Sequence, residues 1–176
     1  RADLIWQSAS PDYSILGKRD YRALAWRFDS PLVRGRYERY YMTHAGAVSG
    51  YAVLRLGDVR GVTAGQIVDF LVRPDDIRPL FAFCVERFRT SEAAAVYCSA
   101  AAPALDRISR LGFLRRLTSL HLMARLNSEQ KVGAAAVCGM QKWFVTAADS
   151  DRDHGLGIAR MAGESVWRPA LAIEGR

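Results

Sequence analysis

Residues 65–88, GQIVDFLVRPDDIRPLFAFCVERF, decide the fold, because an apolar strand and an amphipathic helix follow one another directly. The first part, 65–72, is an almost continuously apolar run bounded by Gly65 and Pro74. Such a run is typical of a strand that is buried on both faces. We therefore expect it to form the centre of a sheet.

The second part carries the clearest helical pattern in the chain. Asp75 and Asp76 can each cap its start, and Pro79 fits a first turn whose amides have no helical partner. The apolar residues that recur with the spacing of one helix face are Ile77, Leu80, Phe81, Cys84, Val85 and Phe88.

The segment before this strand predicts a short helix and a hairpin. RDYRALAWRF at 19–28 has helical spacing of its apolar residues. RYERYYMT at 36–43 and VSGYAVLRL at 48–56 predict two antiparallel strands. Residues 57–64 are expected to form a loop, and residues 1–18 an irregular opening.

The segment after the long helix predicts further strands and one more helix. AAAVYCSA at 93–100 predicts a strand, and 103–111 a second helix that Gly112 ends in the left-handed conformation. LTSLHLMARL at 117–126 alternates as a strand does, and QKWFVTAA at 141–148 predicts a last strand. The predicted order is helix, three strands, helix, strand, helix and two strands.

Composition limits the classes of protein that remain. The chain has 176 residues, of which 50% are hydrophobic and 24% charged, as expected for one globular domain. No run of 18 apolar residues occurs, so we expect no membrane span. The net charge of +7 comes from 22 Arg and 3 Lys against 18 acidic residues. The arginines are scattered, as in the product of a GC-rich genome, so we expect no nucleic-acid partner.

The three cysteines, Cys84, Cys98 and Cys138, are odd in number and far apart, with no CxxC pair. This usage supports neither a disulfide framework nor a zinc site, and it favours a reducing cytoplasm.

The acidic run DSDRD at 149–153 resembles the beginning of a calcium loop. His154 stands where such a loop needs Gly, and Arg160 where it needs Glu. We therefore predict a solvated turn and no metal site.

The order of elements, with the residues that punctuate it, resembles the core of the GNAT superfamily of N-acetyltransferases. WFVTAADSDRD at 143–153 resembles the end of a divergent branch linked to bacterial surface-polysaccharide clusters. The resemblance implies an α/β (α+β) fold with a mixed, mostly antiparallel central sheet flanked by helices. The other matching pieces are WRF at 26–28, SGYAVLR at 49–55, IVDFLV at 67–72 and RLGF at 110–113.

The resemblance covers residues 19–153, within a single acyltransferase domain at 1–153, and leaves 154–176 as a C-terminal tail. Only 25 residues precede Trp26, and the chain does not begin with Met. We expect that an N-terminal part of the family's fold is missing.

The resemblance also implies a binding mode for acetyl-CoA or another acyl-CoA as co-substrate. In the family, the central strand and the next one diverge, and the free strand edge binds the pantetheine amides. The pyrophosphate lies on the amides at the start of the following helix. The acyl carbonyl would lie near Val72, with Cys98 and Ser99 across the gap. The implied cofactor-binding residues are Phe70, Leu71, Val72, Arg73, Ile77 and Arg78.

The turn at 73–80, RPDDIRPL, departs from the family's Gly-rich turn. Its two aspartates would repel a pyrophosphate, and Pro79 has no amide to donate. Arg73 and Arg78 would have to compensate through their side chains. The Asn and Tyr that many members carry align with Ala101 and Ile108 here, so the usual tyrosine acid is missing.

Asp69, an ionisable residue in an apolar strand, is the candidate general base for an attacking amine. The alternative is a buried ion pair with an arginine such as Arg27 or Arg55. Cys98 is either a nucleophile or a buried structural thiol.

Four further residues have simpler interpretations. His44 is expected to be exposed in the hairpin turn, and His121 to lie on the surface or in a substrate groove. Trp26 and Trp143 are expected in the core.

The sequence therefore predicts an acyltransferase that moves an acetyl or other acyl group from acyl-CoA to a small-molecule amine, with an amino sugar among the acceptors. A catalytically silent member of the fold that serves as a binding module is the first alternative. An aminoacyl- or peptidyl-transferring relative is a second. The oligomeric state stays open, a dimer included.

Overall fold

The computed structural model describes residues 1–33, 35–59, 61–101, 104–115, 142–149, 157–158 and 167–173. The strand predicted at 117–126, with His121, lies outside the described residues. So do Cys138 and residues 150–153 of the acidic run.

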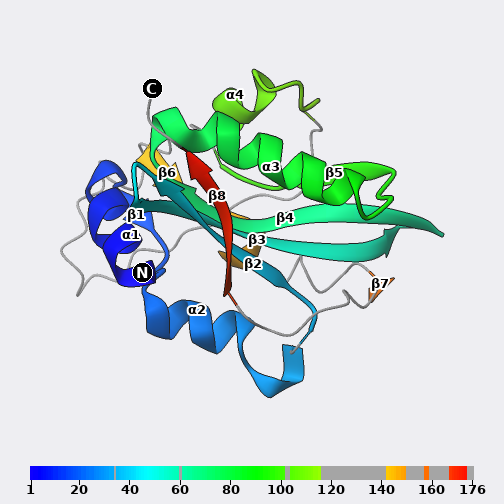
Figure 1. Ribbon diagram of the computed structural model, residues 1–176, viewed down its shortest axis with the longest axis horizontal. Coiled ribbons are helices and arrows are strands. Elements are labelled where there is room, and N and C mark those ends of the chain that lie inside the picture. Colours follow the sequence, from blue (N-terminus) through cyan, green and yellow to red (C-terminus); the bar gives the residue numbers. More distant parts are fainter. Residues whose placement is uncertain are drawn as a thin grey trace, which may run out of the picture.

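A mixed, mostly antiparallel sheet forms the middle of the molecule (Figure 1). Its strands follow the order β5-β4-β3-β2-β8, and β7 pairs with β3 off this path. The pairs β2/β3, β3/β4 and β3/β7 are antiparallel, whereas β4/β5 and β2/β8 are parallel. The strands are β2 (Glu38–His44), β3 (Ala47–Val59), β4 (Val62–Val72), β5 (Ala95–Cys98), β7 (Gly157–Ile158) and β8 (Trp167–Ile173). The fold class predicted from the sequence is confirmed.

Strand β4 is buried continuously from Ala64 to Val72, as its apolar run predicts. It lies between β3 and β5, so the middle of the strand order is β3, and the prediction that β4 is central is corrected to an interior position. This correction follows from β8, which joins the sheet on the far side of β2.

The loop predicted at 57–64 is wrong, because β3 and β4 stay paired as far as Val59↔Val62. Gly61 has a φ of +80°, and its amide donates a 2.9 Å hydrogen bond to Asp58 Oδ1. This closes a tight turn. Residues 57–59 extend β3 and residues 62–64 extend β4, so the hairpin is longer than the sequence predicts.

In the part of the chain that the structure describes, the helices are α1 (Ala2–Ala9), α2 (Tyr21–Phe28), α3 (Ile77–Arg89) and α4 (Ala104–Ser109). Figure 1 shows α3 and α4 on one side of the sheet and α2 on the other. Short 3-10 turns lie at Ser10–Asp12, Pro31–Val33, Pro74–Asp76 and Ala147–Asp149. The irregular opening predicted at 1–18 is wrong in its first part, because α1 buries Ala2, Ile5 and Ala9 against the core.

Two of the predicted helices, α2 and α3, are present in the structure. In α2, Asp20 caps the start by accepting a 2.9 Å hydrogen bond from the Ala23 amide. In α3, the predicted face is buried except for Val85, which is exposed. The ring of Phe81 packs edge-on against Phe70 of β4, with centroids 5.0 Å apart. Burial of each such side chain contributes about 1.5 to 3 kcal/mol to stability.

A second, two-stranded sheet pairs β1 (Ile15–Leu16) in parallel with β6 (Trp143–Phe144). The strand predicted at 141–148 is thus shorter than expected and lies outside the main sheet. An isolated bridge, Ala100↔Thr146, holds the following residues beside the chain that leaves β5.

The two tryptophans predicted to be core differ. Trp143 is buried, as predicted, but Trp26 is 78% exposed, so that prediction is wrong. In α2 the buried stripe runs through Leu24 and Phe28, and Trp26 lies between these positions on the solvent side of the helix.

Residues 167–173, within the segment predicted as a tail, form β8 beside β2. None of the described helices is long and apolar enough to cross a bilayer.

Candidate functional site

The strands β4 and β5 separate partway along their length. Their pairing runs from Ala64↔Ala95 to Ile67↔Cys98, and β4 continues to Val72. Beyond Cys98 the chain turns away and bridges to Thr146. In the described part of the chain, Val68–Val72 therefore have no strand partner on the β5 side. Such an edge can pair with an extended ligand.

A cavity of about 100 Å³ lies at this separation, and we call it the splay cavity. Three of the predicted cofactor-binding residues, Phe70, Val72 and Ile77, line it. The other lining residues are Asp12, Tyr13, Ala104, Arg107 and Phe144. The walls are largely apolar, and burial raises the pKa of Tyr13 while the nearby Arg107 opposes that rise. The cavity suits a narrow, uncharged segment of a ligand.

The remaining predicted cofactor-binding residues do not line the cavity. Leu71 is fully buried and pairs with Tyr51 across the β3/β4 ladder. Arg73 and Arg78 are exposed, one before and one within the first turn of α3. The structure thus brings three of the six residues to one cavity and leaves two cations in solvent beside it.

The carboxylate of Asp76 is engaged at the start of α3. It holds the N-cap position without a side-chain capping bond, and its Oδ1 lies 3.1 Å from Nδ1 of His44. His44 is half-exposed at the end of β2, as the sequence predicts. Asp75 is exposed. The two aspartates of the turn therefore differ, because only Asp75 faces solvent.

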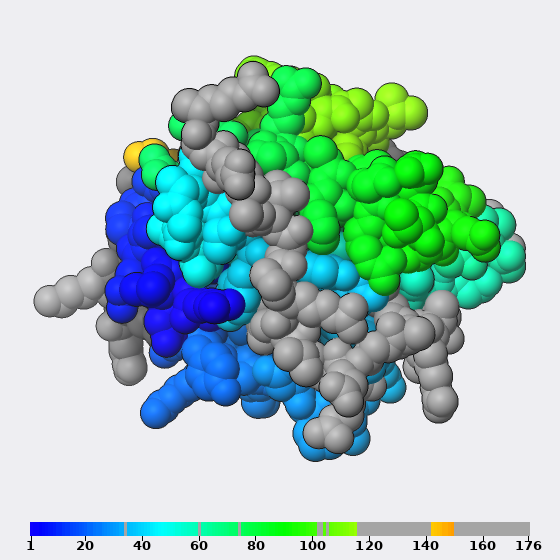
Figure 2. All heavy atoms as spheres, viewed as in Figure 1, coloured from blue at the N-terminus to red at the C-terminus, as the bar shows by residue number. Residues whose placement is uncertain are grey.

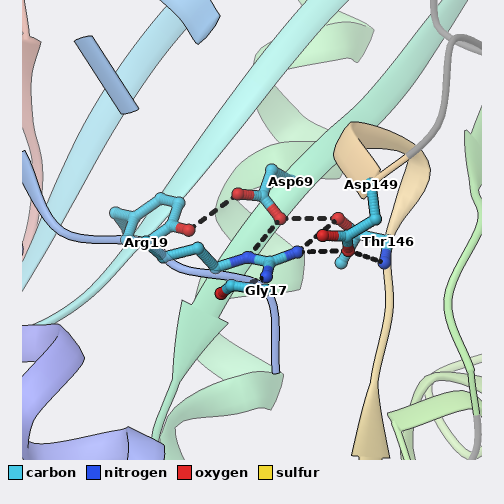
Figure 3. A network of polar contacts seen from close by, with 6 residues as sticks. Gly17, Arg19, Asp69, Thr146 and Asp149 are labelled. Atoms are coloured by element: carbon cyan, nitrogen blue, oxygen red, sulfur yellow. Dashed lines mark hydrogen bonds and ion pairs between the residues drawn. The ribbon is translucent and has the colours of Figure 1, made fainter. Parts of the chain in front are cut away.

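Asp69 is the centre of a buried polar network (Figure 3). Its side chain is 1% exposed. Oδ1 accepts hydrogen bonds from Arg19 Nε at 3.2 Å and from Thr146 Oγ1 at 2.6 Å. Oδ2 accepts one from the Tyr51 hydroxyl at 2.7 Å. The arginine partner that the sequence suggested, Arg27 or Arg55, is therefore replaced by Arg19.

Arg19 and Asp149 extend this network toward solvent. Arg19 Nη1 donates to the Gly17 carbonyl at 2.8 Å, and Nη2 donates to Thr146 Oγ1 at 3.2 Å and pairs with Asp149 Oδ2. The same Asp149 oxygen accepts from the Thr146 amide at 2.8 Å. Figure 3 shows the Arg19 guanidinium between Asp69 of β4 and the side chains of Thr146 and Asp149, which follow β6.

Burial and charge shift the protonation equilibria of the network. Burial of Arg19 by itself disfavours its charged form, but Asp69, Tyr51 and Asp149 outweigh that effect and raise the pKa of the guanidinium. Burial, followed by the adjacent Asp69 carboxylate, raises the pKa of Tyr51 well above 10.0. The arginine is therefore held charged and the tyrosine neutral.

The two residues predicted to face the acyl group lie where β5 ends. Burial raises the pKa of the Cys98 thiol to about 12, and the Asp69 charge adds to that shift. The thiol is thus protonated at neutral pH, the state of a structural cysteine. Ser99 follows it and is half-buried.

A second cavity of about 110 Å³, the α2 cavity, lies on the other face of β4. Asp69, Arg19 and Asp149 line it together with Trp26 and residues of α2. The two cavities share a wall, because Arg19 Cζ lies 5.3 Å from the ring centroid of Phe144 in the splay cavity.

Sequence reasoning missed several residues of these sites. Arg19 reaches Asp69 from 50 residues away in the chain, and no local pattern marks it as the partner. A signal did exist for Phe144, Thr146 and Asp149, since all three lie in the segment 143–153 that carried the family resemblance.

Several of the solved structures that resemble this one are acetyltransferases. An acetyltransferase of Trypanosoma brucei matches with 22% identity over 45% of this chain and 61% of its own, at a TM-score of 0.38. Glucosamine-6-phosphate N-acetyltransferase from Arabidopsis thaliana matches with 12% identity over 47% of this chain and 60% of its own, at a TM-score of 0.38. An aminoglycoside acetyltransferase from an uncultured soil metagenomic sample matches with 11% identity over 72% of this chain and 86% of its own, at a TM-score of 0.47.

The first two matches span about three fifths of the length of those proteins. No family model and no curated protein matches the chain. Several of the solved structures to which this chain is similar in fold are GNAT-type acetyltransferases.

Proposed function

We propose that this chain transfers an acetyl or other acyl group from acyl-CoA to an amine, and that amino sugars are among its acceptors. One observation carries the proposal: the end of β4, Val68–Val72, which has no strand partner on the β5 side among the described residues, borders the splay cavity. Pantetheine is an extended chain with amide groups, so it can bind such an edge as an additional strand does.

The residues around the splay cavity fit the other parts of acyl-CoA. Apolar walls and a volume of about 100 Å³ suit the narrow thioester end. Arg107 at the cavity and the exposed Arg73 and Arg78 supply cations for the phosphates. The sequence offers two aspartates at this turn that would repel a phosphate. Because Asp76 is buried and contacts His44, only Asp75 is left facing solvent there, and the expected repulsion is smaller.

The reaction requires positioning and a proton acceptor. The amine nitrogen attacks the thioester carbon, a C–N bond forms, and the C–S bond breaks with the electron pair leaving on sulfur. The amine gives up one proton, and the thiolate of CoA takes up one on release. Asp69 is the proposed base, with Cys98 and Ser99 beside the acyl group. Because Asp69 already accepts from three donors, one of these hydrogen bonds must open for it to take the proton.

That saturation of Asp69 favours a second candidate function, a catalytically silent binding module. The protonated Cys98 thiol points the same way. A silent module keeps the fold and a ligand cavity but lacks a free base beside the strand end.

Titration calorimetry with acetyl-CoA and longer acyl-CoAs tests the binding step. At one hundred times the dissociation constant, binding stabilises the folded state by about 2.7 kcal/mol, so a rise in Tm reports it too. Release of free thiol in the presence of glucosamine, above the rate without amine, then tests transfer. Binding without thiol release would select the silent module, and absence of binding to any acyl-CoA would overturn the acyltransferase.

A further inference from the structure

The proposed transfer leaves one proton without a donor. When the C–S bond breaks, the electron pair stays on sulfur, and the thiolate must take up a proton. Among the described residues, Asp69 lines the α2 cavity and not the splay cavity. Cys98 and Ser99 line neither. A protein donor to the sulfur therefore belongs to the other residues that line the splay cavity.

One of these lining residues carries a neutral hydroxyl. The polar side chains among the described residues of the lining are Asp12, Tyr13 and Arg107. An ionised carboxylate only accepts hydrogen bonds, and a guanidinium does not release its proton in proteins. The phenol of Tyr13 is thus the group that can give a proton to an anion. Within the part of the chain that the structure describes, its hydroxyl takes part in no hydrogen bond, so it is available to a ligand.

Tyr13 is held at the cavity wall by contacts along the chain and across it. It follows the 3-10 turn Ser10–Asp12 in an extended conformation, with φ −119° and ψ 137°. The next amide, that of Ser14, donates a 2.9 Å hydrogen bond to the Lys142 carbonyl, and β1 then pairs with β6. The Tyr13 ring packs on Phe144, with centroids 5.0 Å apart. These contacts fix the phenol beside the aromatic wall of the cavity.

Solvent reaches the segment that carries Tyr13. In the space-filling view, the N-terminal segment forms the left margin of the molecule, below residues 142–149 (Figure 2). The side chain of Tyr13 is half-buried, and Asp12 and Arg107 beside the same cavity are exposed. Water can therefore return a proton to the phenol after each turnover.

The charges around Tyr13 suit a proton donor. Burial raises the pKa of Tyr13, and Asp12 adds to that rise, whereas Arg107 and Arg19 oppose it. The phenol is therefore neutral before the reaction. An alkyl thiol has a pKa of about 8.5, so transfer of the proton to a thiolate runs uphill and the phenolate is short-lived. The two arginines stabilise that phenolate while it lasts.

We propose that the Tyr13 hydroxyl donates the proton to the sulfur of the leaving CoA, where the splay cavity brings the thioester against the phenol. As the C–S bond breaks, the electron pair stays on sulfur, the hydroxyl proton moves to that sulfur, and water reprotonates the phenolate. The amine's proton goes separately to Asp69, so no further co-reactant is needed. This role rests on the proposed function. Tyr13 precedes residues 19–153, which carry the family resemblance, so no motif of the family assigns it.

Tyr13→Phe removes the hydroxyl and keeps the ring that packs on Phe144. With acetyl-CoA and glucosamine, the variant should release thiol about 10² to 10⁴ times more slowly than the parent, at an unchanged Kd for acetyl-CoA. Tyr21→Phe is the matched control and should equal the parent, because Tyr21 is 59% exposed and does not line the cavity. Equal turnover per folded molecule in Tyr13→Phe and the parent would overturn the proposal.

Calorimetry with CoA and with desulfo-CoA, which carries hydrogen in place of the thiol, tests the contact with sulfur without turnover. At about pH 9 most of the free thiol of CoA is ionised. The affinity for CoA relative to desulfo-CoA should fall at least tenfold from the parent to Tyr13→Phe, because a hydrogen bond to an ion is lost. The affinity for desulfo-CoA itself should not change. An unchanged ratio, or an equal loss of both affinities as expected for a packing role alone, would overturn the proposal.

The same measurements separate this proposal from the proposed function. If the parent binds acetyl-CoA and releases thiol, and Tyr13→Phe does so equally well, the proton donor alone is overturned. If the parent binds neither CoA nor acetyl-CoA, or binds acetyl-CoA without releasing thiol, the acyltransferase is overturned and the proton donor with it.

Discussion

The guanidinium of Arg19 lies over the ring of Phe144, with Cζ 5.3 Å from the ring centroid. Arg19 lines the α2 cavity and Phe144 lines the splay cavity, so this contact is a shared wall between them. Charge on one side of the wall and an aromatic surface on the other are thereby fixed in one geometry. A ligand in the α2 cavity therefore meets an Arg19 that packs on Phe144, and a ligand in the splay cavity meets a Phe144 that packs on Arg19.

Replacement of Arg19 should be strongly destabilising. Arg19→Met keeps most of the volume but leaves the buried Asp69 carboxylate without its cation. Loss of one partner of a buried pair costs about 3 to 5 kcal/mol, measured as the free energy of unfolding in urea. Arg22→Met, at an exposed position of α2, is the control and should change stability by about 0.5 kcal/mol or less. Similar values for the two variants would contradict the network.

Stability should fall as the pH rises above about 10, and Tyr51 should contribute to that fall. The folded-state pKa of Tyr51 lies above 10.0, so the unfolded chain releases this proton first and gains stability relative to the folded one. Cys98, with a pKa raised from 9.0 to about 12, acts in the same direction. Each such proton contributes a slope of up to about 1.4 kcal/mol per pH unit.

Tyr51→Phe isolates the tyrosine's share. At pH 7 the variant should lose about 1.5 to 3 kcal/mol, because a hydrogen bond to a carboxylate is removed. Above pH 10 the difference between parent and variant should shrink. Urea unfolding at several pH values measures the loss at pH 7 and its change with pH. A difference in stability that stays constant or grows above pH 10 would show that the pKa of Tyr51 is not raised in the folded state.

Gly65→Ala should be destabilising by about 1 to 3 kcal/mol, because an added Cβ would overlap the ring of Phe88. Both positions lie in the core between β4 and α3. Phe88→Leu in the Gly65→Ala background should recover part of the loss, although Phe88→Leu alone is destabilising. A double-mutant cycle of unfolding free energies measures the coupling, and strict additivity of the two changes would refute the close approach.

Arg107 should contribute to acyl-CoA binding through a screened electrostatic contact. Arg107→Gln should weaken the affinity, and added salt should reduce the difference between variant and parent. Arg110→Gln is the matched control, since Arg110 follows the same helix, is exposed and does not line the cavity. Calorimetry at two salt concentrations distinguishes them, and equal affinities for both variants would exclude a role for Arg107.

Asp69→Asn separates catalysis from structure. As the base, Asp69 would support a turnover about 10² to 10⁴ times that of the variant, at unchanged acyl-CoA affinity. Its buried contacts with Arg19 also predict a loss of stability. Turnover per folded molecule, with the folded fraction taken from circular dichroism, resolves the two effects. Unchanged turnover per folded molecule would leave Asp69 with a structural role alone.

Most elements between residues 19 and 113 could be predicted because their signals are local, whereas the loop expected at 57–64 is the continuation of the β3/β4 hairpin. The stripe of α3 and the φ of +91° at Gly112 each depend on neighbouring residues. The short α1 was missed because an eight-residue helix with no side-chain cap carries little pattern of its own. Trp26 was misplaced because hydrophobicity alone does not tell which side of a helix faces the core.

Some residues of the candidate site could be predicted from local sequence and others could not. Phe70, Val72 and Ile77 were predicted because strand, turn and helix follow one another along the chain. The partner of Asp69 was not, because Arg19 lies 50 residues away and competes with Arg27 and Arg55 as an equally plausible cation. Only the assembled sheet decides which arginine meets the carboxylate.

The parallel pairing of β2 with β8 means that the outer edge of β2 can be covered only late in synthesis of the chain. Arg39 and Trp167 are register partners although they are 167 − 39 = 128 residues apart in the chain. On a ribosome that adds about 5 to 20 residues per second, the outer edge of β2 waits roughly 6 to 26 s for its neighbour. During that interval a strand edge is open to other nascent chains, so a chaperone or a temporary partner has a defined place and time at which to act.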